Sequence, residues 1–137
     1  MHITPGLIWI GWITVATLAF YIALGFRVAV MRGRCGIKAP AMTGHPDLEC
    51  ALRVQGNTLE FLVPFLAALW LCAIFWAPLP AAVLGVVFLF GRVLYALGYA
   101  SAPNRRYPGF VIAMIALILL LIGTAYGLVR MGLVMGA

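Results

Sequence analysis

Four long apolar stretches constrain this chain more than any other feature of its sequence. They cover residues 7–31, 48–77, 79–101 and 109–135, approximately, and leave little else of the 137 residues. A bilayer core about 30 Å thick needs roughly 20 apolar residues for each helical crossing. We therefore expect an all-α integral membrane protein, a four-transmembrane-helix bundle in which residues 1–137 form a single membrane domain.

The composition excludes an ordinary soluble domain. Hydrophobic residues make up 66% of the chain, charged residues only 9%, and the mean hydropathy is +1.14. The sequence carries no Gly-rich phosphate loop, no Ser-His-Asp order and no nucleic-acid signature. Cys35, Cys50 and Cys72 lack metal-ligand or CxxC spacing, so we expect neither a metal nor a disulfide.

Basic residues gather in two of the three connections between the stretches. Arg32, Arg34 and Lys38 follow the first stretch, and Arg105 and Arg106 follow the third. Positive-inside bias predicts that both loops are cytoplasmic and that both termini lie across the membrane, which we expect to be a bacterial inner membrane. The net charge of +6 has two interpretations. The basic residues either orient the chain in the membrane and attract anionic lipid, or they form a basic entrance that attracts a small anionic substrate.

A polar string interrupts the second stretch. At about 100° per residue, Glu49, Arg53, Asn57 and Glu60 share one face of a helix. Because a charge at membrane depth costs on the order of 3 kcal/mol, this face is presumed functional. A polar network that only holds helices together is the other interpretation, although such bonds contribute only about 0.6 kcal/mol each. Gln55 points away and suits a contact with a second helix or a neighbouring subunit.

The third stretch repeats the pattern with Arg92, Tyr95 and Tyr99 on one stripe. Each tyrosine alone is also compatible with an aromatic belt at the membrane boundary. Arg92 lies about two turns deeper than Tyr99, where a guanidinium requires a carboxylate or a ligand anion. The paired Arg105 and Arg106 are either orientation signals or include a residue that folds back over the site.

Two ordered polar motifs resemble those of the MAPEG family, the membrane-associated proteins of eicosanoid and glutathione metabolism. They are Arg53-x-Gln55-x-Asn57-x-x-Glu60-Phe61 with Pro64-Phe65, and Phe90-Gly91-Arg92-x-x-Tyr95-x-x-Gly98-Tyr99 followed by Arg106. The likeness covers the chain from about Thr43 to the end of the fourth stretch. The segment from Arg105 to Phe110 is most similar to the microsomal glutathione transferase branch.

The resemblance implies a homotrimer that binds glutathione between adjacent subunits near the cytoplasmic face, with no metal. The implied activity is a membrane-bound glutathione transferase that conjugates the thiolate to hydrophobic electrophiles, with glutathione peroxidase activity toward lipid hydroperoxides as a further implication. The resemblance places seven residues around the glutathione co-substrate: Arg53, Gln55, Asn57, Glu60, Arg92, Tyr95 and Tyr99. Arg106 is expected to face the sulfur as the catalytic residue.

Three questions remain open at this level. Arg27, Arg32 or Arg34 could supply the family's first-helix arginine. A non-enzymatic lipid-binding member of the family and a small membrane transporter, with the Arg-Glu face lining a pathway, are the alternative functions. Gln55 could complete the site of a neighbouring subunit.

Overall fold

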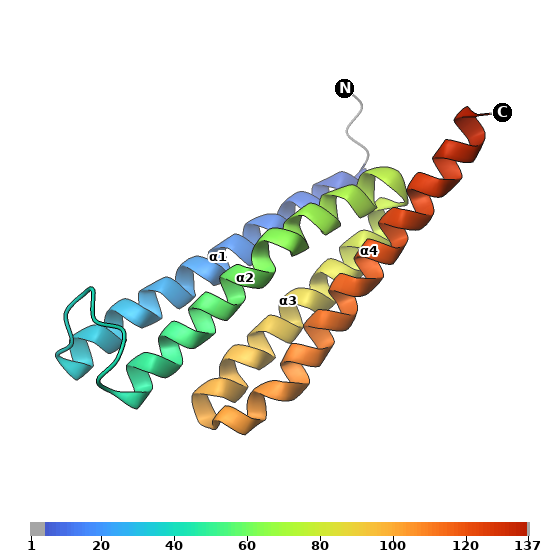
Figure 1. Cartoon of the computed structure of the whole chain (residues 1–137). Helices are drawn as coiled ribbons and strands as arrows, with labels where there is room; N and C mark the ends of the chain where they lie inside the picture. Colours follow the sequence, from blue (N-terminus) through green and yellow to red (C-terminus); the bar gives the residue numbers. More distant parts are fainter. Residues whose placement is uncertain (1–4, 137) are drawn as a thin grey trace.

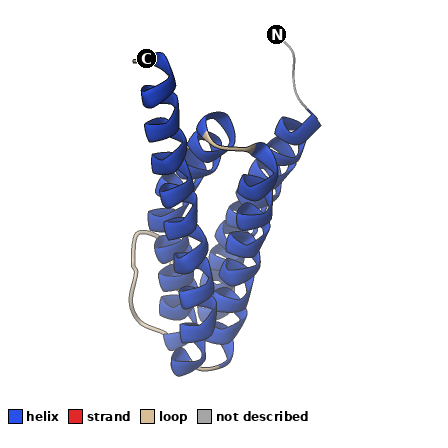
Figure 2. Cartoon of the chain, turned by 90° about the vertical axis from the view of Figure 1, so that its right-hand side faces the viewer, coloured by secondary structure: helices blue, strands red, loops and turns tan. Residues whose placement is uncertain are grey.

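The chain folds into four antiparallel helices that run up, down, up and down (Figure 1). The structure is a computed structural model that describes residues 5–136. The helices are α1 (Pro5–Cys35), α2 (Pro46–Phe75), α3 (Pro78–Ser101) and α4 (Tyr107–Met135), and the short 3-10 helix η1 (Pro103–Arg106) joins α3 to α4. All residues of regular structure within 5–136 are helical (Figure 2). The predicted all-α four-helix bundle is therefore confirmed.

The two ends of the bundle differ in charge. The loop 36–45 and η1 lie at one end, and the connection between α2 and α3 lies at the other, beside the start of α1 and the end of α4 (Figure 1). We call the first of these the basic end, because it carries Arg32, Arg34, Lys38, Arg105 and Arg106. Every long helix is apolar enough to cross a membrane. The chain is thus a multi-pass membrane protein.

The first two helices extend beyond their predicted limits at the basic end. The first was expected at 7–31 but continues to Cys35, since Gly33 does not break it and the helix ends only before Gly36. Gly36 adopts a φ of 67°, and the Ile37 amide donates to the Arg32 carbonyl at 3.1 Å, as in a Schellman termination. The second, expected at 48–77, is Pro46–Phe75.

A side-chain cap explains the early start of α2. His45 is its N-cap, and His45 Nδ1 accepts a hydrogen bond from the Asp47 amide at 3.2 Å. At its other end, the Trp76 and Ala77 amides both donate to the Cys72 carbonyl, which closes the helix before residue 77. The cap and the termination together set the register of the polar face of α2.

The segment 101–109 was expected to be a loop and is instead almost entirely helical. The predicted helices 79–101 and 109–135 are observed as Pro78–Ser101 and Tyr107–Met135. The Arg105 amide donates to the Ala102 carbonyl at 2.9 Å within η1, and α4 follows without a gap. Arg106 is therefore fixed at a junction of two helices.

Close packing of α3 against α4 leaves the open space on the side of α2. A Cβ added at Gly91 would lie 2.7 Å from the Ala113 amide nitrogen, so only glycine permits this approach of the two backbones. Toward the far end, the rings of Phe65 and Phe88 stack with centroids 3.8 Å apart and fill the space between α2 and α3. The bundle is thus filled toward the far end and open between α2 and the α3–α4 pair at the basic end.

Candidate functional site

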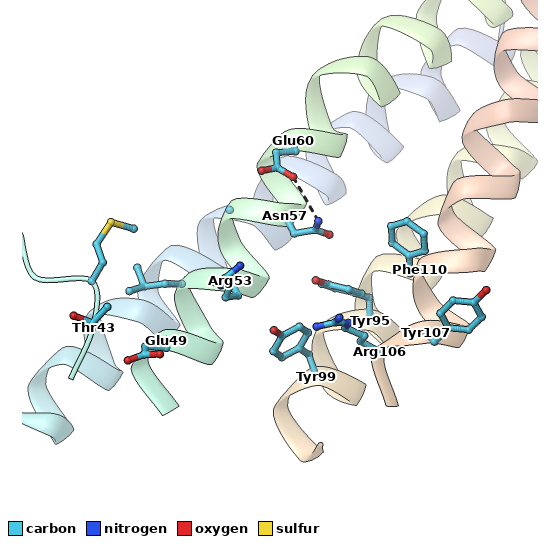
Figure 3. Close-up of a pocket in the computed structure, with 13 residues that line it drawn as sticks. Thr43, Glu49, Arg53, Asn57, Glu60, Tyr95, Tyr99, Arg106, Tyr107 and Phe110 are labelled. Carbon is cyan, nitrogen blue, oxygen red and sulfur yellow. Dashed lines mark hydrogen bonds between the residues drawn. The ribbon is translucent and has the colours of Figure 1, made fainter. Parts of the chain in front are cut away.

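A cavity of about 690 Å³ lies at the basic end between α2 and the corner formed by α3, η1 and α4. The helix α2 contributes its polar face, with Glu49, Arg53, Asn57 and Glu60. The opposite wall carries Tyr95, Tyr99, Arg106, Tyr107 and Phe110. Figure 3 shows Arg53 and Asn57 on α2 opposite the side chains of Tyr95, Tyr99 and Arg106. The cavity thus joins the two polar stripes that were recognised separately in the sequence.

Six of the eight predicted site residues line this cavity. They are Arg53, Asn57, Glu60, Tyr95, Tyr99 and Arg106. The other two, Gln55 and Arg92, lie outside its lining. These two residues are excluded by their positions on the helices. Gln55 projects from a different face of α2, and Arg92 on α3 lies behind the residues that line the cavity.

The charges that line the cavity are balanced. Arg53 and Arg106 supply two guanidinium groups, and Glu49 and Glu60 supply two carboxylates. Glu49 Oε1 already accepts a hydrogen bond from the Gly44 amide at 3.1 Å, so this carboxylate also holds the loop 36–45. A site of this kind suits a small ligand that carries both acidic and basic groups, since each of its charges finds a partner of opposite sign.

Arg92 is buried behind the cavity wall, with a side chain that is only 1% exposed. Its Nη1 and Nη2 atoms each donate to Asn57 Oδ1 at 3.2 Å, and Nη2 also donates to Thr58 Oγ1 at 2.7 Å. The guanidinium carbon lies 4.3 Å from the centroid of the Tyr95 ring and 5.4 Å from that of Phe61. A carboxylate or a ligand anion was expected beside Arg92, and its hydrogen-bond partners within the described residues are two neutral side chains.

Asn57 connects the buried arginine to the cavity. While Asn57 Oδ1 accepts from Arg92, Asn57 Nδ2 donates to Glu60 Oε2 at 3.5 Å (Figure 3). This fixes which end of the amide points inward, because only the oxygen can accept from a guanidinium. An Arg-Asn-Glu network therefore exists, but its arginine is Arg92 from α3 rather than the neighbouring Arg53.

Arg106 lies over an aromatic surface at the basic end of the cavity. Its guanidinium carbon is 5.0 Å from the centroid of the Tyr99 ring, and that ring lies 5.8 Å from the ring of Tyr95. Gly98 allows this arrangement, since a Cβ there would overlap the carbonyl oxygen of Arg105. The Arg106 side chain is exposed and makes no hydrogen bond within the described residues, so its donors are available to a ligand.

The first-helix arginines and Gln55 lie elsewhere. The amide nitrogen of the Gln55 side chain approaches Gly25, 3.3 Å from where a Cβ would stand, so this side chain faces α1 of the same chain. Arg32 Nη1 donates to the Ala41 carbonyl at 2.6 Å, while Arg27 and Arg34 line a separate, smaller cavity. None of the three arginines lines the larger cavity.

Sequence reasoning missed several residues of the site. Glu49 had been placed on the polar face of α2 but had received no role, although periodicity alone put it beside Arg53. Thr58 gave no signal, because its importance depends on the position of Arg92 on another helix. Tyr107 and Phe110 form the apolar edge of the cavity, and only the helical start of α4 brings them there.

Comparison with known proteins gives a consistent result. The model of the MAPEG family matches residues 10–126. An uncharacterised protein of Synechocystis sp. is 44% identical over 117 residues, which are 85% of this chain and 85% of that protein. Microsomal glutathione S-transferase 2 of Homo sapiens is 35% identical over 79% of this chain and 72% of its own length. Leukotriene C4 synthase of Cavia porcellus is 34% identical over 84% of this chain and 78% of its own length.

Proposed function

Because the chain belongs to the MAPEG family, we propose that it is a membrane-bound glutathione transferase acting on hydrophobic electrophiles. The observation that carries the proposal is the cavity lined by two guanidinium groups, two carboxylates and three tyrosine rings. Relatives named as a glutathione transferase and a leukotriene synthase support the same class of chemistry. The proposal thus combines the ancestry of the chain with the chemistry of its site.

The charged groups of glutathione match those of the cavity. The tripeptide carries two carboxylates, one ammonium group and one thiol. Arg53 binds a carboxylate through its planar pair of donors, and Glu60 accepts hydrogen bonds from the ammonium group. Tyr95 and Tyr99 offer hydroxyl groups from the opposite wall. One carboxylate and the ammonium group then each have a partner of opposite charge, and the second carboxylate can accept hydrogen bonds from the tyrosine hydroxyls.

Arg106 faces the sulfur and is the catalytic residue in this proposal. A free thiol has a pKa of about 8.5, and only its thiolate attacks an electrophile. A guanidinium beside the sulfur stabilises the anion, while the proton leaves to solvent at the open end of the cavity. The thiolate then forms a carbon–sulfur bond with the electrophile, whose leaving group departs with the electron pair.

The second substrate is apolar and arrives from the bilayer. Tyr107 and Phe110 form an aromatic edge where the cavity meets α4. The thiolate would attack an oxygen of a lipid hydroperoxide that reaches this edge. The O–O bond would break, and the lipid would be released as an alcohol. The resulting glutathione sulfenic acid reacts with a second glutathione, giving the disulfide and water. Peroxidase activity therefore needs no group beyond those of the transferase.

The proposed assembly is a homotrimer with glutathione bound between subunits. Gln55 serves the neighbouring site in this proposal, from the face of α2 where its amide lies beside Gly25 of α1. The basic end faces the cytoplasm and both termini lie across a bacterial inner membrane. The loop charges support this orientation, and the cyanobacterial relative supports a bacterial membrane. Membrane lipid surrounds the apolar outer face of the helices.

The decisive experiment compares Arg106→Ala with Arg105→Ala. Both residues are exposed arginines of η1, but only Arg106 lines the cavity. With purified protein, Arg106→Ala is expected to keep much of the glutathione affinity while losing the ultraviolet thiolate signal and turnover of a model electrophile. Arg105→Ala is expected to retain all three.

Unchanged turnover in Arg106→Ala would contradict the mechanism. Calorimetry provides the test of the wider assignment. Tight fatty-acid binding without glutathione binding would favour the lipid-binding member of the family, and solute flux in liposomes would favour a transporter.

A further inference from the structure

A second cavity, of about 300 Å³, lies at the basic end among the last turns of α1, the first turns of α2 and the end of α3. Its charged and polar lining consists of Arg27, Arg34, His45, Asp47 and Cys50, and Ala100 closes it from α3. It shares no lining residue with the larger cavity. A substitution in the lining of one cavity therefore leaves the lining of the other unchanged within the chain.

Arg27 and Arg34 stand on one face of α1. Seven residues separate them, which is close to two turns and about 10 Å along the helix axis. Neither guanidinium forms a hydrogen bond or ion pair to the part of the chain that the structure describes, and Arg27 is partly buried. Oδ2 of Asp47, the acidic residue of this cavity, lies 3.8 Å from Nδ1 of His45. Two cations thus face one small cavity with their donors unused.

Exposed apolar side chains lie deeper than the arginines on both flanking helices. Phe26 precedes Arg27 on α1 and is 70% exposed, and Leu97 lies one turn below Ala100 on α3 and is 63% exposed. These residues belong to segments that cross the hydrocarbon region. A phospholipid with its charged group beside the arginines would place its apolar chains along the exposed apolar surface of these two helices.

We propose that this cavity binds the phosphate group of a membrane phospholipid, with Arg27 and Arg34 as its phosphate ligands. Guanidinium groups match the geometry of phosphate oxygens, and juxtamembrane basic residues attract phospholipid headgroups. Asp47 selects between phosphate species, because a carboxylate in the lining repels a dianion such as inorganic phosphate more than a singly charged phosphodiester. Contact between the acyl chains and the apolar surface of the helices adds binding free energy that a soluble phosphate lacks.

The test uses the full-length protein, purified and stripped of lipid in detergent. Binding of dioctanoyl phosphatidylglycerol is measured by native mass spectrometry and calorimetry for two double variants. Arg27→Gln with Arg34→Gln removes both phosphate ligands. Lys38→Gln with Arg105→Gln is the matched control, because it removes the same charge from exposed residues of the basic end that line neither cavity.

The first double variant is expected to bind the lipid about tenfold or more weakly, as for the loss of charge-assisted hydrogen bonds, and the control within about twofold of the unmodified protein. Dioctanoylglycerol, which lacks the phosphate, and inorganic phosphate, which lacks the chains, are both expected to bind weakly. If the double variant misfolds by circular dichroism, Arg34→Gln alone serves, since this side chain is exposed and its loss is expected to weaken binding about threefold.

Three results would overturn the proposal. Equal weakening in both double variants would mean diffuse attraction to the basic end. Equal binding of dioctanoylglycerol would mean that the phosphate is not recognised. Competition by inorganic phosphate at the affinity of the lipid would mean that the site takes a soluble anion instead.

Discussion

The terminal nitrogens of Arg92 both donate to a single oxygen, Oδ1 of Asn57, at 3.2 Å each. The two residues come from α3 and α2, so this bond joins the two polar stripes across the bundle. Arg92 is buried and Asn57 lines the cavity, so the asparagine connects the arginine to the cavity. We propose on this basis that Arg92 is a positioning residue, whereas the motif had suggested a direct ligand.

Asn57→Ala should weaken glutathione binding. The substitution removes the shared acceptor of Arg92 and the donor to Glu60 in one step. Nη1 of the buried Arg92 then loses its acceptor, which costs about 1–3 kcal/mol, although Nη2 keeps Thr58. We therefore expect a lower unfolding temperature and a dissociation constant for glutathione at least tenfold higher. Calorimetry with glutathione and thermal unfolding measure the two effects. Binding as tight as in the unmodified protein would show that Asn57 is dispensable.

Thr58→Val should separate positioning from packing. Valine keeps the shape of threonine but removes the Oγ1 acceptor that lies 2.7 Å from Arg92. The guanidinium is then free to shift away from Asn57, and we expect KM for glutathione to rise by roughly tenfold while kcat is largely kept. Thr58→Ser, which retains the hydroxyl, should restore the KM. Equal defects in valine and serine variants would instead indicate a role in packing.

Gly98→Ala should displace Arg106, the proposed catalytic residue, without touching the ligand. A Cβ at this position overlaps the Arg105 carbonyl, so η1 must move and carry Arg106 with it. The expected outcome is a fall in kcat with little change in KM, since a small misplacement of a catalytic group can cost about 100-fold in rate. Gly132→Ala is the control, because a Cβ there meets no atom within 4 Å. Similar kcat values for both variants would argue against this role of Gly98.

Glu60→Gln tests which end of the ligand lies beside this carboxylate. If Glu60 binds the ammonium group, its neutral amide should bind glutathione about tenfold more weakly, as for loss of one charge-assisted hydrogen bond. A glutathione analogue without the amine should bind equally to both proteins. The difference between the two ligands, measured by calorimetry, isolates the contact. A matching loss for the analogue would place the ammonium group elsewhere.

Accessibility of introduced cysteines tests the orientation in the membrane. In a variant that lacks Cys35, Cys50 and Cys72, Arg105→Cys marks the basic end and Gly136→Cys the far end, and both positions are exposed. A membrane-impermeant thiol reagent added to spheroplasts should label position 136 and spare position 105 until the membrane is opened. The reverse pattern would mean that the basic loops lie outside.

Local sequence patterns predicted much of the site because they depend on one helix at a time. The face formed by Arg53, Asn57 and Glu60 follows from helical periodicity, and these three side chains do line one cavity. The bond from Asn57 to Glu60 also follows from their three-residue spacing. Contacts between helices could not be predicted in this way. Thr58 is an example, because no pattern on α2 indicates its hydrogen bond with Arg92.

The sequence by itself determined that the chain is a membrane bundle of four helices, since the length and hydropathy of each apolar stretch admit little else, and it identified the family through two ordered motifs. Only the tertiary structure decided that Arg92 reaches Asn57 and Thr58 instead of a carboxylate, and that Arg27 and Arg34 share a cavity which Arg32 does not join. The physical reason is that the partners of a side chain on another helix depend on how each helix is rotated about its axis and on how closely the helices pack. Here Gly91 and Gly98 allow the backbones of neighbouring helical segments to approach closely. The periodicity of a single helix carries no information about such an approach between two segments.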